Sequence, residues 1–222
     1  METLETMQIK FGETLGESLF VLEPKIHRLQ HDWQVYRSFF GANKERWDFL
    51  HETGGVATMS IETALWDSVI LSLCRLTDVQ SSSDHQLATL HQLSPKRVTY
   101  SDASVGRSIK KAIKEAVDAT KLVREIRSNR VAHANLEVAL GQRVVDRVSR
   151  AQIEEAVIAI SKPLKLIYGG ICDTDILDGP PIGSSDSAVK LLNSLYLGTT
   201  VERSKVDRSN YPNWLMFGEW DR

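Results

Sequence analysis

Apolar residues recur every three or four positions along most of the chain, the spacing that places them on one face of an α-helix. Pro24 lies inside the clearest stripe and predicts a kink or the start of a new helix. Because this spacing dominates the chain, we expect an all-α fold. The stripe runs through residues 13–40 as Leu15, Leu19, Leu22, Ile26, Leu29, Trp33, Tyr36 and Phe40.

Turn-forming and capping residues divide the rest of the chain into further helices. Ser149 and Gln152 match a capping box, which predicts a helix start, and Gly169-Gly170 predicts the end of that helix. Residues 138–148 fit either a short strand pair or an extended loop. The other expected helices are 43–53, with Gly54-Gly55 breaking or weakening the pattern, 56–78 as the apolar central core helix, a short helix carrying Leu87, Leu90 and Leu93 with Asp84 as its cap, a long helix 102–126, and 187–197.

Size and composition are those of one globular domain. The chain has 222 residues, of which 42% are hydrophobic and 25% charged, and no polar linker divides it. We therefore expect a single domain over residues 1–222, with a core at about 13–170 and a C-terminal extension at 171–222. The end of the extension is aromatic and is expected to dock on the body or on a partner subunit; it carries Tyr211, Trp214, Phe217 and Trp220.

Cysteine usage and terminal composition indicate a cytoplasmic protein. Cys74 and Cys172 form no Cys-x-x-Cys pair, so neither a disulfide framework nor a metal site is expected, and no cofactor is predicted. The apolar Cys74 segment favours a buried, inert thiol. The N-terminal residues 1–7 are acidic, unlike a signal peptide, and the apolar stretches are interrupted before the roughly 18 residues that a membrane span requires.

Positive charge is concentrated in one part of the chain. Residues 96–130 contain ten Lys/Arg and four Asp/Glu, a balance of +6, whereas the whole chain carries −2. On a helix, Lys121, Arg124, Arg127 and Arg130 form one basic stripe because they recur at intervals of three. Such a stripe either binds a phosphate backbone, here RNA, or is a solvated helix face.

Arg127 and His133 are the candidate catalytic pair. Histidine titrates near neutral pH and can transfer protons, and arginine can hold the charge that develops on phosphorus. On a straight helix the two residues lie about 120° and about 9 Å apart, so a shared site requires a bent or terminated helix. In the alternative interpretation, His133 neutralises a helix dipole, Arg127 pairs with a carboxylate, and Arg75 and Asp78 pair with each other or cap their helix.

The segment from Arg127 to His133, Arg-Ser-Asn-Arg-Val-Ala-His, resembles the Arg, four-to-six residues, His signature of the HEPN superfamily. Residues 71–78, Leu-Ser-Leu-Cys-Arg-Leu-Thr-Asp, followed by a serine loop, resemble the abortive-infection U-type HEPN-like group. The resemblance covers about residues 61–135. It implies a HEPN-like helical bundle with a long central helix pair, extra C-terminal helices and an aromatic tail, and commonly a homodimer.

The resemblance also implies a function. Many members are metal-independent endoribonucleases of toxin–antitoxin or antiphage systems, so an antitoxin protein is an expected partner. In this chain Arg127 would stabilise the phosphorane and His133 would act as acid or base. Ser128 stands where the family usually has Asn, Asp or His, and Asn129 follows it, so these two are supporting polar residues. The alternative is a non-catalytic HEPN-like module that binds a nucleotide, RNA or a partner protein.

Overall fold

The computed structural model describes residues 2–41, 43–79, 87–131, 136–142, 146–172 and 184–200. Within these ranges every regular element is a helix, which confirms the all-α prediction. The α-helices are α1 (Leu4–Phe11), α2 (Glu13–Tyr36), α3 (Lys44–Thr77), α4 (Ala103–Ala119), α5 (Lys121–Ile126), α6 (Leu136–Ala139), α7 (Arg150–Cys172) and α8 (Ser184–Thr200); a 3-10 turn spans Leu90–Leu93, and π-helical turns span Arg37–Gly41 and Arg127–Val131.

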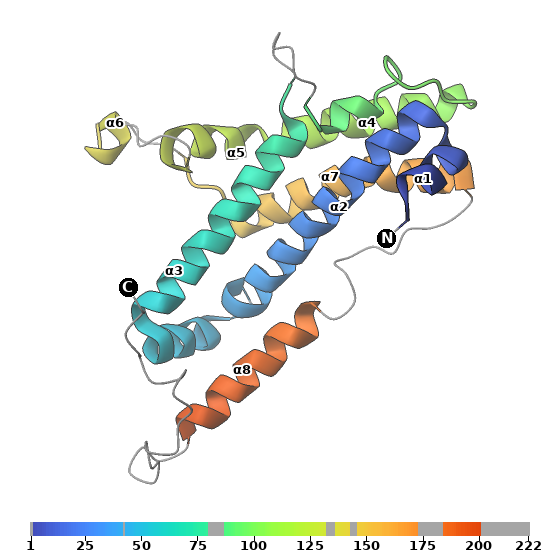
Figure 1. The fold of residues 1–222 in the computed structure, drawn as a ribbon. Helices are drawn as coiled ribbons and strands as arrows, with labels where there is room; N and C mark the ends of the chain where they lie inside the picture. Colours follow the sequence, from blue (N-terminus) through green and yellow to red (C-terminus); the bar gives the residue numbers. More distant parts are fainter. Residues whose placement is uncertain are drawn as a thin grey trace, which may run out of the picture.

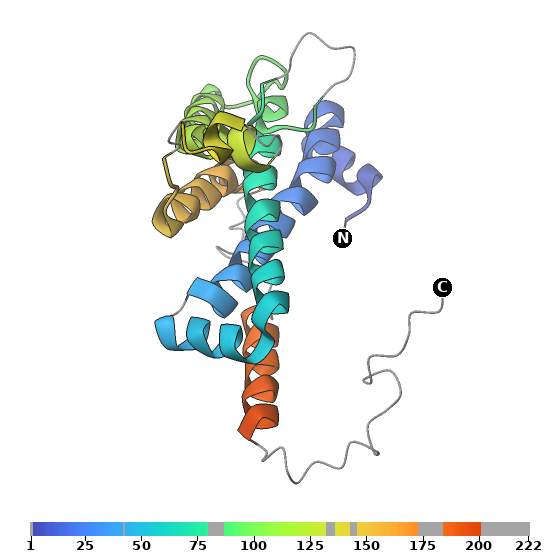
Figure 2. The same ribbon diagram turned by 90° about the vertical axis from the view of Figure 1, so that its left-hand side faces the viewer.

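Two long helices organise the bundle. α2 and α3 lie side by side, as the expected central pair, and α7 packs against both of them and against α4 (Figure 1). The view turned by 90° shows α3 running the length of the molecule, with α8 beyond the end of α2 (Figure 2). The C-terminal end of α3 therefore lies close to α5, which carries the candidate site.

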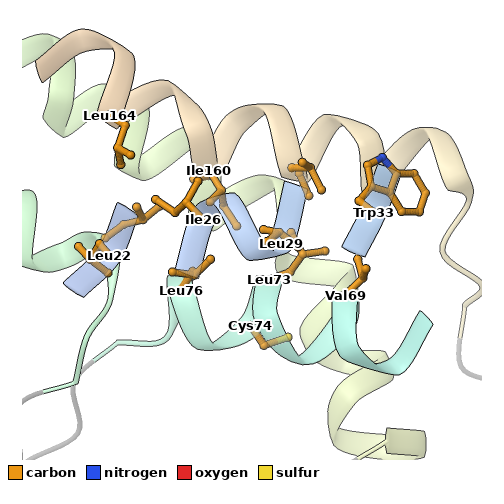
Figure 3. Packing of buried hydrophobic residues seen from close by; sticks show 14 of the residues in the cluster. Leu22, Ile26, Leu29, Trp33, Val69, Leu73, Cys74, Leu76, Ile160 and Leu164 are labelled. Atoms are coloured by element: carbon orange, nitrogen blue, oxygen red, sulfur yellow. The ribbon is translucent and has the colours of Figure 1, made fainter. Parts of the chain in front are cut away.

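The core lies where α2, α3 and α7 meet. Figure 3 shows side chains from all three helices pointing toward one another, and most of them are fully shielded from solvent. The apolar stripe predicted for the first long helix forms one wall of this core. The central members are Leu22, Ile26 and Leu29 of α2, Val69, Leu73 and Leu76 of α3, and Ile160 and Leu164 of α7.

Two helices continue through residues that were expected to interrupt them. α2 runs without a break through Pro24, and α7 runs through Pro163 and past Gly169-Gly170 to Cys172. Packing on both sides of each proline outweighs the hydrogen bond that the proline removes. A Cβ at Gly170 would lie 2.9 Å from Val105 Cγ2, so this glycine permits close packing of α7 on α4 instead of ending the helix.

The expected helices 43–53 and 56–78 form one element with a bend. Asn43 caps it through its side-chain oxygen, which accepts from Arg46 N at 2.8 Å, and Gly55 makes the bend with φ +48° and ψ −125°. Across the bend, Thr58 Oγ1 donates to the Leu50 carbonyl at 2.9 Å. The glycine pair therefore redirects the helix sharply without ending it.

Replacing Gly55 with alanine is expected to lower the free energy of unfolding by about 1–2 kcal/mol, because an L side chain opposes a positive φ. Chemical denaturation measures this effect. Gly198→Ala is the matched control: Gly198 has ordinary helical geometry with open space around it, so alanine there should stabilise the chain slightly. A Gly55→Ala protein as stable as wild type would contradict a strained bend.

The first part of α3 beyond the bend is not core, contrary to the expectation for segment 56–78. Val56, Met59 and Ile61 are 79%, 56% and 55% exposed, because this part of α3 extends beyond the contacts with α7. By length and mean hydropathy alone, α3 could cross a membrane, which corrects the expectation that every apolar stretch is too short. Core helices of water-soluble proteins meet the same criterion, and the absence of a membrane partner stays a prediction.

The remaining predicted segments have mixed outcomes. The helix expected at 102–126 divides at Thr120 into α4 and α5, and the helix expected near Leu87 is a 3-10 turn that starts at Leu90. In the ambiguous segment 138–148, the described residues form the end of α6 and a turn, with no strand among them. Asp84 and the aromatic tail from Tyr211 to Trp220 lie outside the described residues.

Candidate functional site

Arg127 stands where a helix changes its winding. α5 ends at Ile126, and the chain continues from Arg127 to Val131 as a π-helical turn, a wider form that is frequent at functional sites. The bent helix end that a shared Arg/His site requires is therefore present at Arg127. His133 lies outside the described residues, so its distance from Arg127 stays a prediction.

An ion pair connects Arg127 to the end of α3. Arg127 Nη1 donates to Asp78 Oδ2 at 2.8 Å, and the two side chains are 31% and 29% exposed. Asp78 is the C-cap residue of α3, whereas Arg75 is exposed, so Asp78 pairs across the bundle and not with its neighbour Arg75. The carboxylate engages one nitrogen of the guanidinium: Arg127 Nε is buried and has no hydrogen-bond partner among the described residues.

The basic stripe predicted along one helix face is not assembled as such. Arg124 points into the bundle, where its guanidinium donates to Thr77 Oγ1 at 2.7 Å, Thr120 Oγ1 at 2.9 Å and the Val117 carbonyl at 2.8 Å. Its hydrogen-bonding capacity therefore holds α3, α4 and α5 together. Nothing is described of the Arg130 side chain.

The surroundings of Lys121 are acidic. Lys121 is exposed, but it lines a pocket of about 400 Å³ with the carboxylates of Asp118, Glu125, Asp146 and Glu155. These charges oppose the approach of a phosphate to Lys121. An RNA-binding role for Lys121, Arg124 and Arg130 stays a prediction that this geometry does not favour.

The two supporting polar residues follow Arg127 in the π-helical turn. Ser128 is exposed, and Asn129 Nδ2 donates to the Glu125 carbonyl at 2.7 Å. The Asn129 amide therefore helps to close the wide turn behind Arg127. Its supporting role at a catalytic site stays a prediction.

Buried groups lie behind the ion pair. Burial raises the pKa of the Cys74 thiol to about 11, and the residue is fully shielded, which confirms the prediction of a buried thiol. Burial also lowers the pKa of His91, although a hydrogen bond to the Thr77 backbone opposes that shift. His91 Nε2 is buried without a hydrogen-bond partner among the described residues. The fold therefore favours neutral His91.

Acidification should destabilise the protein partly through His91. Its folded pKa lies below the unfolded value of about 6.5, so the unfolded state takes up the proton first and stability falls as pH drops below about 6.5. His91→Gln should reduce this fall, as measured by denaturant titrations between pH 7 and pH 5. An unchanged pH dependence in the variant would contradict the assignment to His91.

A pocket of about 430 Å³ lies between α2 and the C-terminal end of α3, and the sequence interpretation missed it. Lys25, Arg28 and Arg75 line it together with Asp78, the partner of Arg127. The available signal was the Arg-Leu-x-Asp segment itself, which contains both Arg75 and Asp78. In the described ranges no group of three or more His, Cys, Asp or Glu side chains could hold a metal ion.

The two sequence segments that resemble a known family thus meet in space, through Asp78 and Arg127. A family model described as AbiU2 (HEPN_AbiU2) matches residues 17–190. The chain belongs to the HEPN AbiU2 family. No curated protein and no solved structure matches the chain.

The match extends from α2 into α8 and includes both partners of the Asp78–Arg127 ion pair. It confirms the resemblance to the HEPN abortive-infection group, and the AbiU2 chain is an abortive-infection HEPN-like module with a helical fold. The predicted domain limits, with a core at about 13–170, stay a prediction.

Proposed function

We propose that this AbiU2 protein is a metal-independent endoribonuclease that acts as a homodimer in toxin–antitoxin or antiphage defence. One observation carries the proposal. The guanidinium of Arg127 is half-buried at a π-helical turn, and Asp78 holds it through a single nitrogen. An arginine held in this way is oriented before substrate arrives and keeps donors for a second anion.

The chemistry requires groups that move protons. The 2′-oxygen of a ribose attacks the neighbouring phosphorus, its proton passes to a neutral histidine, and the bond from phosphorus to the 5′-oxygen breaks as a protonated histidine donates to that oxygen. The products are a 2′,3′-cyclic phosphate and a 5′-hydroxyl. Each chain provides one His133, so a two-fold dimer would provide both the base and the acid.

Comparison of wild-type protein with His133→Ala tests the proposal. Both proteins are incubated with a pool of cellular RNAs in the presence of EDTA, and the new termini are assayed for cyclic phosphate. Wild-type protein should cleave, and His133→Ala should lose at least about 100-fold in rate. His27→Ala, on α2, is a control because His27 lines a different pocket from the one beside Asp78. Equal cleavage by wild type and His133→Ala would exclude catalysis through His133.

The Asp78–Arg127 ion pair also favours a second candidate function. The carboxylate offsets the charge of Arg127, and Ser128 departs from the usual family residue, as expected for a module that binds RNA, a nucleotide or a partner protein without cleaving RNA. RNA that binds tightly to the wild-type protein but remains intact under all conditions, including in the cells that contain it, would favour this second function.

A further inference from the structure

We propose that the pocket between α2 and α3 is a subsite for a nucleotide of RNA next to the phosphodiester at Arg127. The inference rests on the proposed RNA-directed function. The pocket is formed by α2, by the C-terminal end of α3 and by the segment before the 3-10 turn, and it encloses about 430 Å³ (Figure 1). That volume lies within the range of small-molecule sites in proteins.

The charge of the pocket selects an anion. Lys25 and Arg75 are exposed at its rim, and neither side chain forms an ion pair or hydrogen bond with any described residue. Arg28 also lines the pocket and shares its charge with Asp32, which its Nε contacts at 2.8 Å. The only carboxylate among the lining residues, that of Asp78, is already paired with Arg127. A bound phosphate would therefore meet a net excess of positive charge.

The rest of the lining is mainly apolar. Leu76 is buried, and Leu87 and Pro24 present aliphatic surface, while Thr89 and Ser72 contribute hydroxyl groups. A ligand that fits must combine an anionic group at the cationic rim with a body that covers aliphatic surface. A nucleotide has this combination, whereas a bare inorganic anion would leave the apolar wall in contact with water.

The position of Asp78 relates the pocket to the proposed catalytic arginine. Its side chain lines the pocket, and its Oδ2 accepts from Arg127 Nη1 at 2.8 Å. The pocket and the guanidinium thus lie on either side of one carboxylate. If a scissile phosphate binds at Arg127, the adjoining nucleotide of the same strand can reach Lys25 and Arg75. These two cations, and not the acidic surroundings of Lys121, then mark the path of the RNA.

Charge reversal tests the subsite by a binding measurement that needs no catalysis. The double variant Lys25→Glu/Arg75→Glu should bind a fluorescent 2′-O-methyl RNA oligonucleotide at least about tenfold more weakly than wild type at fixed salt. The control Lys110→Glu/Lys114→Glu changes net charge equally on the exposed face of α4 and should weaken binding much less. Equal losses in the two variants would overturn the subsite, since they would reflect only the general field of the protein.

A milder variant protects the test against misfolding. Lys25→Gln/Arg75→Gln should retain the wild-type circular dichroism spectrum and unfolding temperature, and should reduce the slope of log affinity against log salt by about 2. An unchanged slope would also overturn the proposal. Because the 2′-O-methyl RNA cannot be cleaved, a protein without ribonuclease activity could still pass both tests.

Competition by a free nucleotide distinguishes the two sources of the same chemistry. Adenosine monophosphate should displace the oligonucleotide only weakly if the pocket binds one unit of a longer chain. If the mononucleotide binds as tightly as the oligonucleotide and the double variant abolishes its binding, the pocket is a site for a free nucleotide and the RNA subsite is overturned.

Discussion

Replacing Arg127 with lysine is expected to lower the rate of RNA cleavage by about 100-fold or more, while the free energy of unfolding changes by less than about 1 kcal/mol. Lysine keeps the charge but lacks the planar fork, so it cannot hold Asp78 and a phosphorane at the same time. Initial rates on RNA and chemical denaturation measure the two effects. Arg107→Lys, on the exposed face of α4, is the matched control and should leave both values unchanged.

The companion variant Asp78→Asn separates the two candidate functions. If Asp78 is a positioning residue, cleavage should fall by about 10- to 100-fold because Arg127 loses its fixed orientation. If Asp78 instead only offsets the charge of Arg127 in a non-catalytic module, RNA should bind more tightly to the variant and remain uncleaved. A faster cleavage rate in Asp78→Asn would contradict the positioning role directly.

The second large effect concerns stability. Leu73→Ala should lower the free energy of unfolding by about 3–4 kcal/mol, because Leu73 is fully buried in the core of α2, α3 and α7 and its truncation leaves a cavity (Figure 3). The corresponding fall in unfolding temperature is about 10 °C for a chain of this size.

A matched substitution on the surface isolates the contribution of the cavity. Leu191→Ala removes the same atoms from α8 at a position that is 51% exposed, and it should cost less than about 1 kcal/mol. Similar losses in the two variants would mean that the α2–α3–α7 core is packed more loosely than described here.

The helical fold was predictable because apolar spacing reports directly on which face a helix buries. The stripe from Leu15 to Phe40 appears in the structure as the buried face of α2 and the turn after it. Helix ends were harder to predict. Pro24 and Gly169-Gly170 are local signals, and they gave way to packing with residues far away in the sequence, such as Val105 against Gly170.

The candidate site was predictable only in part, because a linear motif does not specify partners. Arg127 was identified from the sequence, but its ion pair with Asp78 depends on how α3 and α5 cross. Intervals of three suggested that Arg124 belongs to a solvent-facing stripe, whereas the break at Thr120 turns it inward to three hydrogen bonds. The cationic pocket of Lys25 and Arg75 also joins two helices, so no single stretch of sequence contains it.

The bend at Gly55 and the ion pair at Asp78 lie at the two ends of one uninterrupted stretch of helix. One residue inserted between them would turn Asp78 by about 100° around the helix axis and advance it by about 1.5 Å. Its carboxylate would then face away from Arg127. The number of residues from Gly55 to Asp78 is therefore constrained as strictly as the identity of Arg127, and changes in chain length near this site should be tolerated only after Asp78.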